Sequence, residues 1–219
     1  MVAREKPVPI DQDILERLNR GVLQRTGAYR TNDHIVLRSG RHTSEYVAKA
    51  MVTTEPTFTE GLGDLIAAHF SRSEVDLVLT TGYGAGLLGH CVARTHPSRP
   101  RFIFATKAKT TDRRTEVTLQ PEYRAFFAEG GRVLIVEDIV TTGETVKQLV
   151  RLVEGMGGQV VGIGAIWRRS SRVKFKYPLF TVVTRDFPTY DPAECPMCKQ
   201  GDPINADFGG GPSEDEPDD

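Results

Sequence analysis

The sequence predicts an α/β protein, with a mostly parallel central sheet flanked by helices and a small N-terminal cap. Short aliphatic segments of strand length alternate with amphipathic segments of helical length over most of the chain, and this alternation is typical of strands joined by helical crossovers. The chain has 219 residues, of which 39% are hydrophobic. That length and content suit one ordinary domain with its own core.

The elements can be assigned in order along the chain. Residues 11–26 carry apolar residues at helical spacing, and Asp11 or Asp13 near the start is suited to cap a helix. Residues 34–52 mix short apolar runs with turn residues, and we expect an irregular or strand-rich cap there. The remaining predictions are helix 58–70, strand 75–80, helix 85–95, strands 101–106 and 132–137, helix 144–156, and strands 160–167 and 179–184.

Two stretches differ from this alternation. Residues 107–120 are polar and rich in Lys, Arg and Thr, so we expect either a mobile loop or an exposed hairpin. The acidic end, residues 209–219, is strongly polar and is expected to be disordered. We therefore predict one domain over residues 1–208, with residues 10–52 contributing to the cap.

Composition argues against several classes of protein. The formal net charge is −1, which is unlike a general nucleic-acid-binding or membrane-surface protein. No apolar run approaches the length of a membrane span, and the N-terminus lacks the apolar core of a signal peptide. Three cysteines do not make a disulfide framework. We therefore expect a cytoplasmic protein.

Residues 133–145, VLIVEDIVTTGET, carry the strongest functional signal. The aliphatic start predicts a strand buried on both faces, and it runs into Glu137 and Asp138. Two carboxylates are costly to bury without partners, and the C-terminal edge of a parallel sheet is where α/β proteins bind ligands. These carboxylates are suited to accept hydrogen bonds from sugar hydroxyls or to hold a divalent cation.

The turn after the acidic pair is suited to a phosphate. Thr141, Thr142 and Gly143 supply hydroxyls and free backbone N–H groups where a helix is expected to begin, and Glu144 and Thr145 open that helix. The segment thus supplies acceptors for a ribose and donors for its 5′-phosphate. The alternative is a buried strand followed by an acid-capped turn with no ligand.

Residues 133–145 resemble the phosphoribosyl-pyrophosphate signature of type I phosphoribosyltransferases, and all thirteen positions fit. The resemblance implies the type I phosphoribosyltransferase fold, a homodimer, and Mg²⁺ held mainly by the substrate. It also implies that Glu137 and Asp138 fix the ribose hydroxyls and that residues 141–145 hold the 5′-phosphate. Glu144 is then expected to turn its carboxylate away from the phosphate.

A second candidate loop follows the predicted strand 75–80. Its glycines would let the backbone approach a charged ligand closely, and in the resembled family a loop at this place binds the pyrophosphate. The alternative is a purely structural turn. The candidate residues are Thr80, Thr81, Gly82, Tyr83 and Gly84.

Residues 84–89, GAGLLG, also match the dinucleotide fingerprint G-x-G-x-x-G. That fingerprint requires an acidic residue at the end of the next strand to bind a ribose. The next predicted strand ends instead in Thr106 and Lys107. We therefore do not favour dinucleotide binding.

Residues 37–51, LRSGRHTSEYVAKAM, resemble a Ser-Gly-x-x-Ser-x-x-Tyr stretch of orotate phosphoribosyltransferases. In that family this region holds the base and a lysine that contacts the pyrophosphate. Arg41 and Lys49 would be cations near two anionic substrates; the alternative is a basic surface on the cap. The residues nearly in step with this pattern are Ser39, Gly40, Ser44 and Tyr46, with Lys49 following.

One part of the chain departs from the orotate pattern. Orotate phosphoribosyltransferases usually carry a mobile Lys-rich loop, often Lys-Asp-His-Gly, whereas residues 106–114 read TKAKTTDRR and lack His-Gly. Four cations remain in this stretch, and Lys107 and Lys109 are the candidate catalytic cations. The departure leaves the identity of the base open.

The C-terminal region contains a C-x-x-C pair, Cys195 and Cys198. A structural zinc site needs four ligands, and no second Cys or His pair is evident, because Cys91 and the five histidines are scattered. Similar endings occur in some orotate phosphoribosyltransferases. The alternatives are a zinc site, a site pooled between two protomers, and a redox-active pair. The scattered histidines are His34, His42, His69, His90 and His96.

The resemblance implies transfer of the ribosyl 5-phosphate unit from phosphoribosyl pyrophosphate to orotate, giving orotidine 5′-monophosphate and pyrophosphate. The partners expected are these small molecules, with no nucleic acid and no membrane. One alternative is a phosphoribosyltransferase for another base, as in purine salvage. Another is a non-catalytic regulator that binds phosphoribosyl pyrophosphate, but the sequence shows no helix-turn-helix or basic face for such a role.

Overall fold

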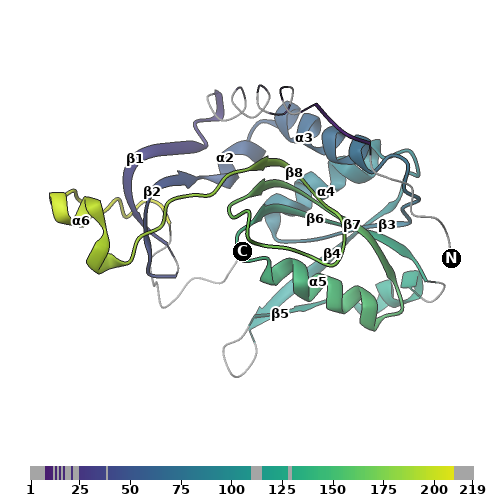
Figure 1. The fold of residues 1–219 in the computed structure, drawn as a ribbon. Helices are drawn as coiled ribbons and strands as arrows, with labels where there is room; N and C mark the ends of the chain where they lie inside the picture. Colours follow the sequence, from purple (N-terminus) through teal and green to yellow (C-terminus); the bar gives the residue numbers. More distant parts are fainter. Residues whose placement is uncertain are drawn as a thin grey trace.

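The computed structural model describes residues 8–11, 13, 15, 17, 21, 25–37, 39–109, 115–127 and 130–209. Its centre is a six-stranded sheet with the order β5-β4-β3-β6-β7-β8 (Figure 1). Strand β5 is antiparallel to β4, and the other neighbouring pairs are parallel. The strands are β3 (Leu77–Thr81), β4 (Arg101–Lys109), β5 (Thr115–Thr118), β6 (Arg132–Val140), β7 (Gln159–Arg168) and β8 (Leu179–Thr184).

Helices cover both faces of this sheet (Figure 1). Helices α3 (Pro56–His69) and α4 (Tyr83–Thr95) pack in one buried cluster with Val78, Leu134 and Ile166 of the sheet. Helix α5 (Glu144–Gly155) packs in a second cluster on the other face. Strand β6 contributes to both clusters and is buried along most of its length. The predicted α/β class, with a mostly parallel sheet, is confirmed.

Several element boundaries differ from the sequence-based prediction. Strand β6 continues past Glu137 to Val140, because β7 pairs with it as far as Val140 and Arg168. Strand β4 extends to Lys109 because it pairs with β5. Of the two alternatives for residues 107–120, the structure therefore shows a hairpin, and its residues 110–114 lie outside the described part.

The N-terminal helix predicted for residues 11–26 falls partly on residues outside the described ranges. The described positions from residue 13 to residue 26 are helical. The predicted disordered tail also lies almost wholly outside them, since the description ends at residue 209. Among the described helices, none is long and apolar enough to cross a membrane.

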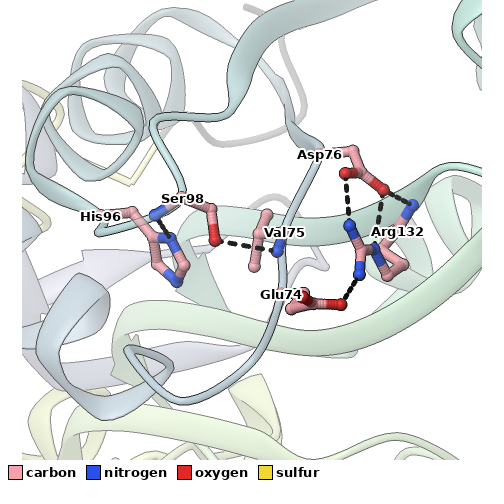
Figure 2. A network of polar contacts seen from close by, with 6 residues as sticks. All are labelled: Glu74, Val75, Asp76, His96, Ser98 and Arg132. Atoms are coloured by element: carbon pink, nitrogen blue, oxygen red, sulfur yellow. Dashed lines mark hydrogen bonds and ion pairs between the residues drawn. The ribbon is translucent and has the colours of Figure 1, made fainter. Parts of the chain in front are cut away.

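A polar network ties the N-terminal ends of β3 and β6 together (Figure 2). The Arg132 guanidinium donates to Asp76 at 2.7 and 2.8 Å and also contacts Glu74. Nearby, Ser98 accepts from the Val75 N–H, at 3.4 Å. This network lies before β3 and at the start of β6, so it closes the edge of the sheet opposite the acidic pair.

The cap is built from both ends of the chain. Strands β1 (Tyr29–Val36) and β2 (His42–Val47) form an antiparallel hairpin, and α6 (Pro196–Gln200) lies beside it (Figure 1). His42 and Tyr190 exchange backbone hydrogen bonds of 2.9 and 2.8 Å. The cap therefore includes residues far beyond the predicted 10–52. The remaining elements are α2 (Lys49–Thr53), η1 (Pro121–Phe127) and η2 (Pro192–Glu194).

Candidate active site

The acidic pair lies where the order of the sheet reverses. From β3 the chain continues to β4 on one side of the sheet, and from β6 it continues to β7 on the other side. The neighbouring strands β3 and β6 therefore form a topological switch point. Open α/β sheets bind ligands at this place, outside the carboxyl ends of the strands. The pairing of β3 with β6 stops at Leu79 and Ile135, so Glu137 and Asp138 follow where the two strands separate.

Asp138 is paired with a lysine from the cap. Its side chain is buried, with 3% of the residue exposed, and its Oδ2 lies 3.0 Å from Nζ of Lys49. Its Oδ1 accepts from the Ile139 N–H at 2.6 Å. The structure thus brings together Asp138 and Lys49, which sequence reasoning selected from two separate segments. The cation offsets the cost of burying this carboxylate.

The protonation equilibria of the pair and its lysine are coupled. Burial and the neighbouring Asp138 charge raise the pKa of Glu137 well above its ordinary value. Burial opposes the charge of Lys49, but Asp138, Glu137 and Tyr46 together raise its pKa. The site therefore combines a carboxyl whose charged form is destabilised by burial with a second acidic side chain that pairs with the Lys49 ammonium.

The predicted phosphate turn leads directly into α5 through a left-handed glycine. Gly143 is in the left-handed region at φ 77° and directly precedes α5. A Cβ on Gly143 would lie 2.7 Å from the Phe175 ring, so the turn requires glycine. The Glu144 carboxylate accepts from Arg151 at 2.8 Å and is thereby directed along its own helix. The Glu144 carboxylate therefore does not cap the first backbone N–H groups of α5.

The glycine loop meets the acidic pair directly. Gly82 has φ 83° and forms the turn from β3 into α4. A Cβ on Gly84 would lie 2.6 Å from Oδ2 of Asp138. Thr80 and Thr81 are buried, and their hydroxyls have no hydrogen-bond partner within the described part of the chain. Two segments selected separately from the sequence, the glycine loop and the acidic pair on β6, therefore meet at Asp138.

The dinucleotide fingerprint has a packing role. Its glycines lie inside α4, after the turn that Gly82 makes. A Cβ on Gly86 would lie 3.1 Å from the Phe104 ring, and one on Gly89 would clash with Thr80. These glycines let the helix approach β3 and β4 closely.

The candidate cations lie at different distances from the acidic pair. Lys107 on β4 lies near enough to Glu137 to oppose the rise in the pKa of that carboxyl. The backbone of Lys109 belongs to β4, and its side chain is outside the described part. Arg41 donates to the Thr189 carbonyl at 2.9 Å. Among the described contacts, none joins Arg41 or Ser39 to the acidic pair.

Sequence reasoning missed Arg169, which follows β7 beside the end of β6. Its N–H donates to the Val140 carbonyl at 2.9 Å, and its guanidinium lies 4.8 Å from the centre of the Phe187 ring. Burial lowers its pKa, which the nearby Tyr46 opposes. Its Nε has no partner among the described residues. The sequence did contain a signal for this residue. Arg168 and Arg169 form a basic pair at the end of a parallel strand, and that strand neighbours the one with the acidic pair.

Comparison with known proteins agrees with this geometry. The family model described as the phosphoribosyl transferase domain matches residues 51–190, which include both loops and the acidic pair. The chain therefore belongs to the phosphoribosyltransferase family. Its curated relatives within that family include the orotate phosphoribosyltransferase of Thermotoga maritima, which is 35% identical over 83% of this chain and 92% of that protein. The orotate phosphoribosyltransferase of Thermus thermophilus is 33% identical over 88% and 98%.

Solved structures show the same fold. The orotate phosphoribosyltransferase from Aeropyrum pernix has a TM-score of 0.56 and 19% identity, covering 75% of this chain and 92% of that one. The adenine phosphoribosyltransferase from Trypanosoma brucei has a TM-score of 0.58 and 15% identity, covering 82% and 83%. Enzymes for different bases match equally well, so the likeness supports the type I phosphoribosyltransferase fold and leaves the base undecided.

Proposed function

We propose that this protein is an orotate phosphoribosyltransferase of pyrimidine biosynthesis. It transfers ribosyl 5-phosphate from phosphoribosyl pyrophosphate to orotate, giving orotidine 5′-monophosphate and pyrophosphate. The observation that carries the proposal is the meeting of the acidic pair with the glycine loop, where Gly84 abuts Asp138. The curated relatives are named orotate phosphoribosyltransferases, and this chain matches them over most of their length. These relatives support the choice of base.

The acidic pair is assigned to the ribose. Displacement at the anomeric carbon develops positive charge on the ring, and a fixed carboxylate close to that charge lowers the barrier. Asp138 supplies this charge, while Glu137 binds a ribose hydroxyl. The ion pair with Lys49 at 3.0 Å supports the assignment, because it holds the Asp138 carboxylate in one orientation before substrate binds.

The two turns are assigned to the two anionic ends of phosphoribosyl pyrophosphate. The 5′-phosphate is held by Thr141, Thr142, Gly143 and Thr145 at the start of α5, where backbone N–H groups and the helix dipole favour negative charge. The pyrophosphate is held by the loop from Thr81 to Gly84 at the end of β3. With its two anionic ends held in this way, the substrate would have its anomeric carbon above the acidic pair.

Magnesium is the cofactor of this proposal, held mainly by the pyrophosphate oxygens of the substrate. Carboxylate and phosphate oxygens are the ligands that Mg²⁺ prefers, and the acidic pair fits that donor set. When bound, the ion neutralises the charge of the leaving pyrophosphate. Lys107 and Lys109 add positive charge from the β4–β5 hairpin.

Arg169 is assigned to the base. Orotate carries a carboxylate, and a guanidinium binds carboxylates through two parallel hydrogen bonds. Arg169 is half-buried, follows a strand that borders the acidic pair, and has an Nε without a partner in the described part of the chain. Tyr46 lies near it, so the cap residue and Arg169 would face the base together. A neutral purine gives Arg169 no carboxylate to bind.

We further propose a homodimer in the cytoplasm, with residues 1–208 as one domain. The resemblance of residues 133–145 to type I phosphoribosyltransferases, and of residues 37–51 to the orotate enzymes among them, supports the dimer. Size-exclusion chromatography with light scattering measures this directly. A monomer at micromolar concentration that retains full activity would contradict the dimer but not the reaction.

A base panel tests the reaction. Pyrophosphate release is followed with phosphoribosyl pyrophosphate, Mg²⁺ and, in turn, orotate, uracil, hypoxanthine, xanthine and adenine. Orotate alone is expected to give rapid release, and a metal chelator is expected to stop it. Release with a purine and none with orotate would replace orotate in the proposal. Binding of phosphoribosyl pyrophosphate with no release from any base would favour a regulator.

A further inference from the structure

The structure gathers four potential metal ligands that the sequence left scattered. His34 and His42 come from the two strands of the β1–β2 hairpin, and Cys195 and Cys198 come from the start of α6. Their ligand atoms all lie within 4.8 Å of one another. The second pair that the C-x-x-C motif appeared to lack is therefore present. We propose that these four residues bind one structural zinc ion.

The distances between ligand atoms match a tetrahedral site. Zn–S bonds of about 2.3 Å and Zn–N bonds of about 2.0–2.1 Å place sulfur and nitrogen about 3.5 Å apart on a tetrahedron. Nε2 of His34 lies 3.7 Å from Sγ of Cys195 and 3.5 Å from Sγ of Cys198. Sγ of Cys198 lies 3.4 Å from Nδ1 of His42. Three distances from two separate segments thus fall near the value that one zinc ion requires.

The two imidazoles are already turned toward a common point. Nε2 of His34 and Nδ1 of His42 are 2.8 Å apart, compared with about 3.3 Å for two nitrogens on one zinc. The rings therefore need to separate by about half an ångström when the metal enters. A hydrogen bond between the two nitrogens accounts for the 2.8 Å distance, and zinc would take the place of its proton.

A hydrogen bond behind the cluster sets the tautomer of His34. Its Nδ1 lies 2.8 Å from the carbonyl oxygen of Asp202, and a carbonyl can only accept, so the proton is on Nδ1. The lone pair of Nε2 is therefore directed at the sulfurs and at His42. Zinc-bound histidines are held in this way by a carbonyl or carboxylate on the other ring nitrogen.

The choice of metal and role follows from the donor set. Two thiolates and two imidazoles are a structural zinc set, and thiolates disfavour magnesium or calcium. His34, His42 and Cys195 are buried, and Cys198 is exposed. Four protein ligands fill a tetrahedron, which leaves no open position for a substrate. A redox-active disulfide would account for the two cysteines but would give the two histidines no role. The zinc ion would join the hairpin that precedes Lys49 to the C-terminal segment.

Metal analysis of the full-length protein is the first test. Protein grown and purified without added chelator is expected to contain one zinc per chain, measured by inductively coupled plasma mass spectrometry. Titration with an organomercurial is expected to release that zinc as Cys195 and Cys198 react, detected with a metallochromic dye. Replacement by Co²⁺ is expected to give the intense visible absorption of a tetrahedral thiolate site.

Matched cysteine variants provide the second test. Cys198→Ser removes one ligand and is expected to lose most of the zinc and to lower the melting temperature. Cys91→Ser, on α4 and outside the cluster, is expected to keep one zinc per chain. If Cys198→Ser does not fold, the metal content and Co²⁺ spectrum of the natural protein still decide the question.

Two outcomes would overturn the zinc proposal. One is natural protein without stoichiometric zinc and without a Co²⁺ spectrum after metal exchange. The other is a Cys195–Cys198 disulfide, found by mass spectrometry of the peptide after thiol blocking without reductant. Neither outcome bears on the base panel, because the cluster does not include a residue assigned to the reaction.

Discussion

Glu137 and Asp138 are adjacent along β6, yet their carboxyl groups have different surroundings. Asp138 faces the Lys49 ammonium at 3.0 Å. Glu137 has a pKa raised well above its ordinary value by burial and by the neighbouring Asp138 charge, so its protonated form is stabilised. The two residues are therefore expected to respond differently when each is replaced by its amide.

Asp138→Asn is expected to lower turnover by about 10²–10³, the typical loss when one electrostatic partner of a transition state is removed. Glu137→Gln is expected to cost less than about tenfold, or about 1.4 kcal/mol, because a neutral amide resembles a protonated carboxyl. Both are measured as kcat with saturating phosphoribosyl pyrophosphate and orotate.

The control for this pair is Glu154→Gln on α5, where the carboxylate is exposed and pairs with Lys176. It should leave turnover unchanged. Melting temperatures of all three variants are compared, so that a folding defect is separated from a catalytic one. Near-normal turnover in Asp138→Asn would refute its assigned role, and equal losses in both amide variants would show that Glu137 acts as an anion.

At the scale of elements, the turn into α5 depends on Gly143. Gly143→Ala is expected to destabilise the fold by about 1–3 kcal/mol, the cost of holding a non-glycine residue in a disfavoured backbone region, and to raise the KM for phosphoribosyl pyrophosphate. The Cβ would also meet the Phe175 ring at 2.7 Å. Urea unfolding and steady-state kinetics measure the two effects.

Gly155→Ala at the other end of α5 is the matched control. A Cβ there meets nothing within 4 Å and φ is not positive, so alanine is expected to stabilise the protein by about 0.4–1 kcal/mol. Its KM should not change. An unchanged KM in Gly143→Ala would separate this turn from phosphate binding.

The β4–β5 hairpin is expected to contribute cations and little stability. Replacing Lys107 and Lys109 together by alanine should lower kcat, because positive charge near the leaving pyrophosphate is lost, while the melting temperature changes little. Lys147→Ala, at an exposed position of α5, serves as the charge control. A large fall in melting temperature with unchanged kcat would assign these lysines a structural role.

At the scale of the whole molecule, buried histidines link stability to pH. His96 accepts from the Ser98 N–H and lies 3.0 Å from the Phe70 carbonyl, and burial lowers its pKa. The unfolded chain therefore takes up a proton first as the pH falls. Stability is fully present above about pH 6.5, the ordinary histidine pKa, and declines below it until the folded-state pKa is passed.

Melting temperatures from about pH 8 to about pH 5 measure this linkage. His96→Gln should show a shallower decline than the natural protein, although it is less stable at neutral pH. His90→Gln, at an exposed position of α4, should keep the full decline. The pKa of His69 is lowered as well, so some decline remains. Identical slopes in all three proteins would exclude His96 as a source.

The sequence predicted those features that depend on neighbouring residues. Residues 133–145 contain a strand, an acidic pair and a turn in one stretch, so the order of residues alone was sufficient to predict them. Lys49 was predicted because residues 37–51 resemble a segment of orotate phosphoribosyltransferases. Arg169 and the His–Cys cluster were missed because their partners lie on other elements. His34 meets Cys198 across 164 positions, and spacing cannot indicate such a pair.

The joining of the cap from both chain ends has a consequence for synthesis on the ribosome. The β1–β2 hairpin leaves the ribosome early, but Thr189, whose carbonyl accepts a hydrogen bond from Arg41, is made 148 positions later. At about 5–20 residues per second, that wait lasts roughly 7–30 s. During this interval the strand edge of β2 lacks the chain that later covers it, and unpaired edges attract other chains. The exposed edge is thus a route to aggregation during synthesis, and a premature stop would leave that edge uncovered.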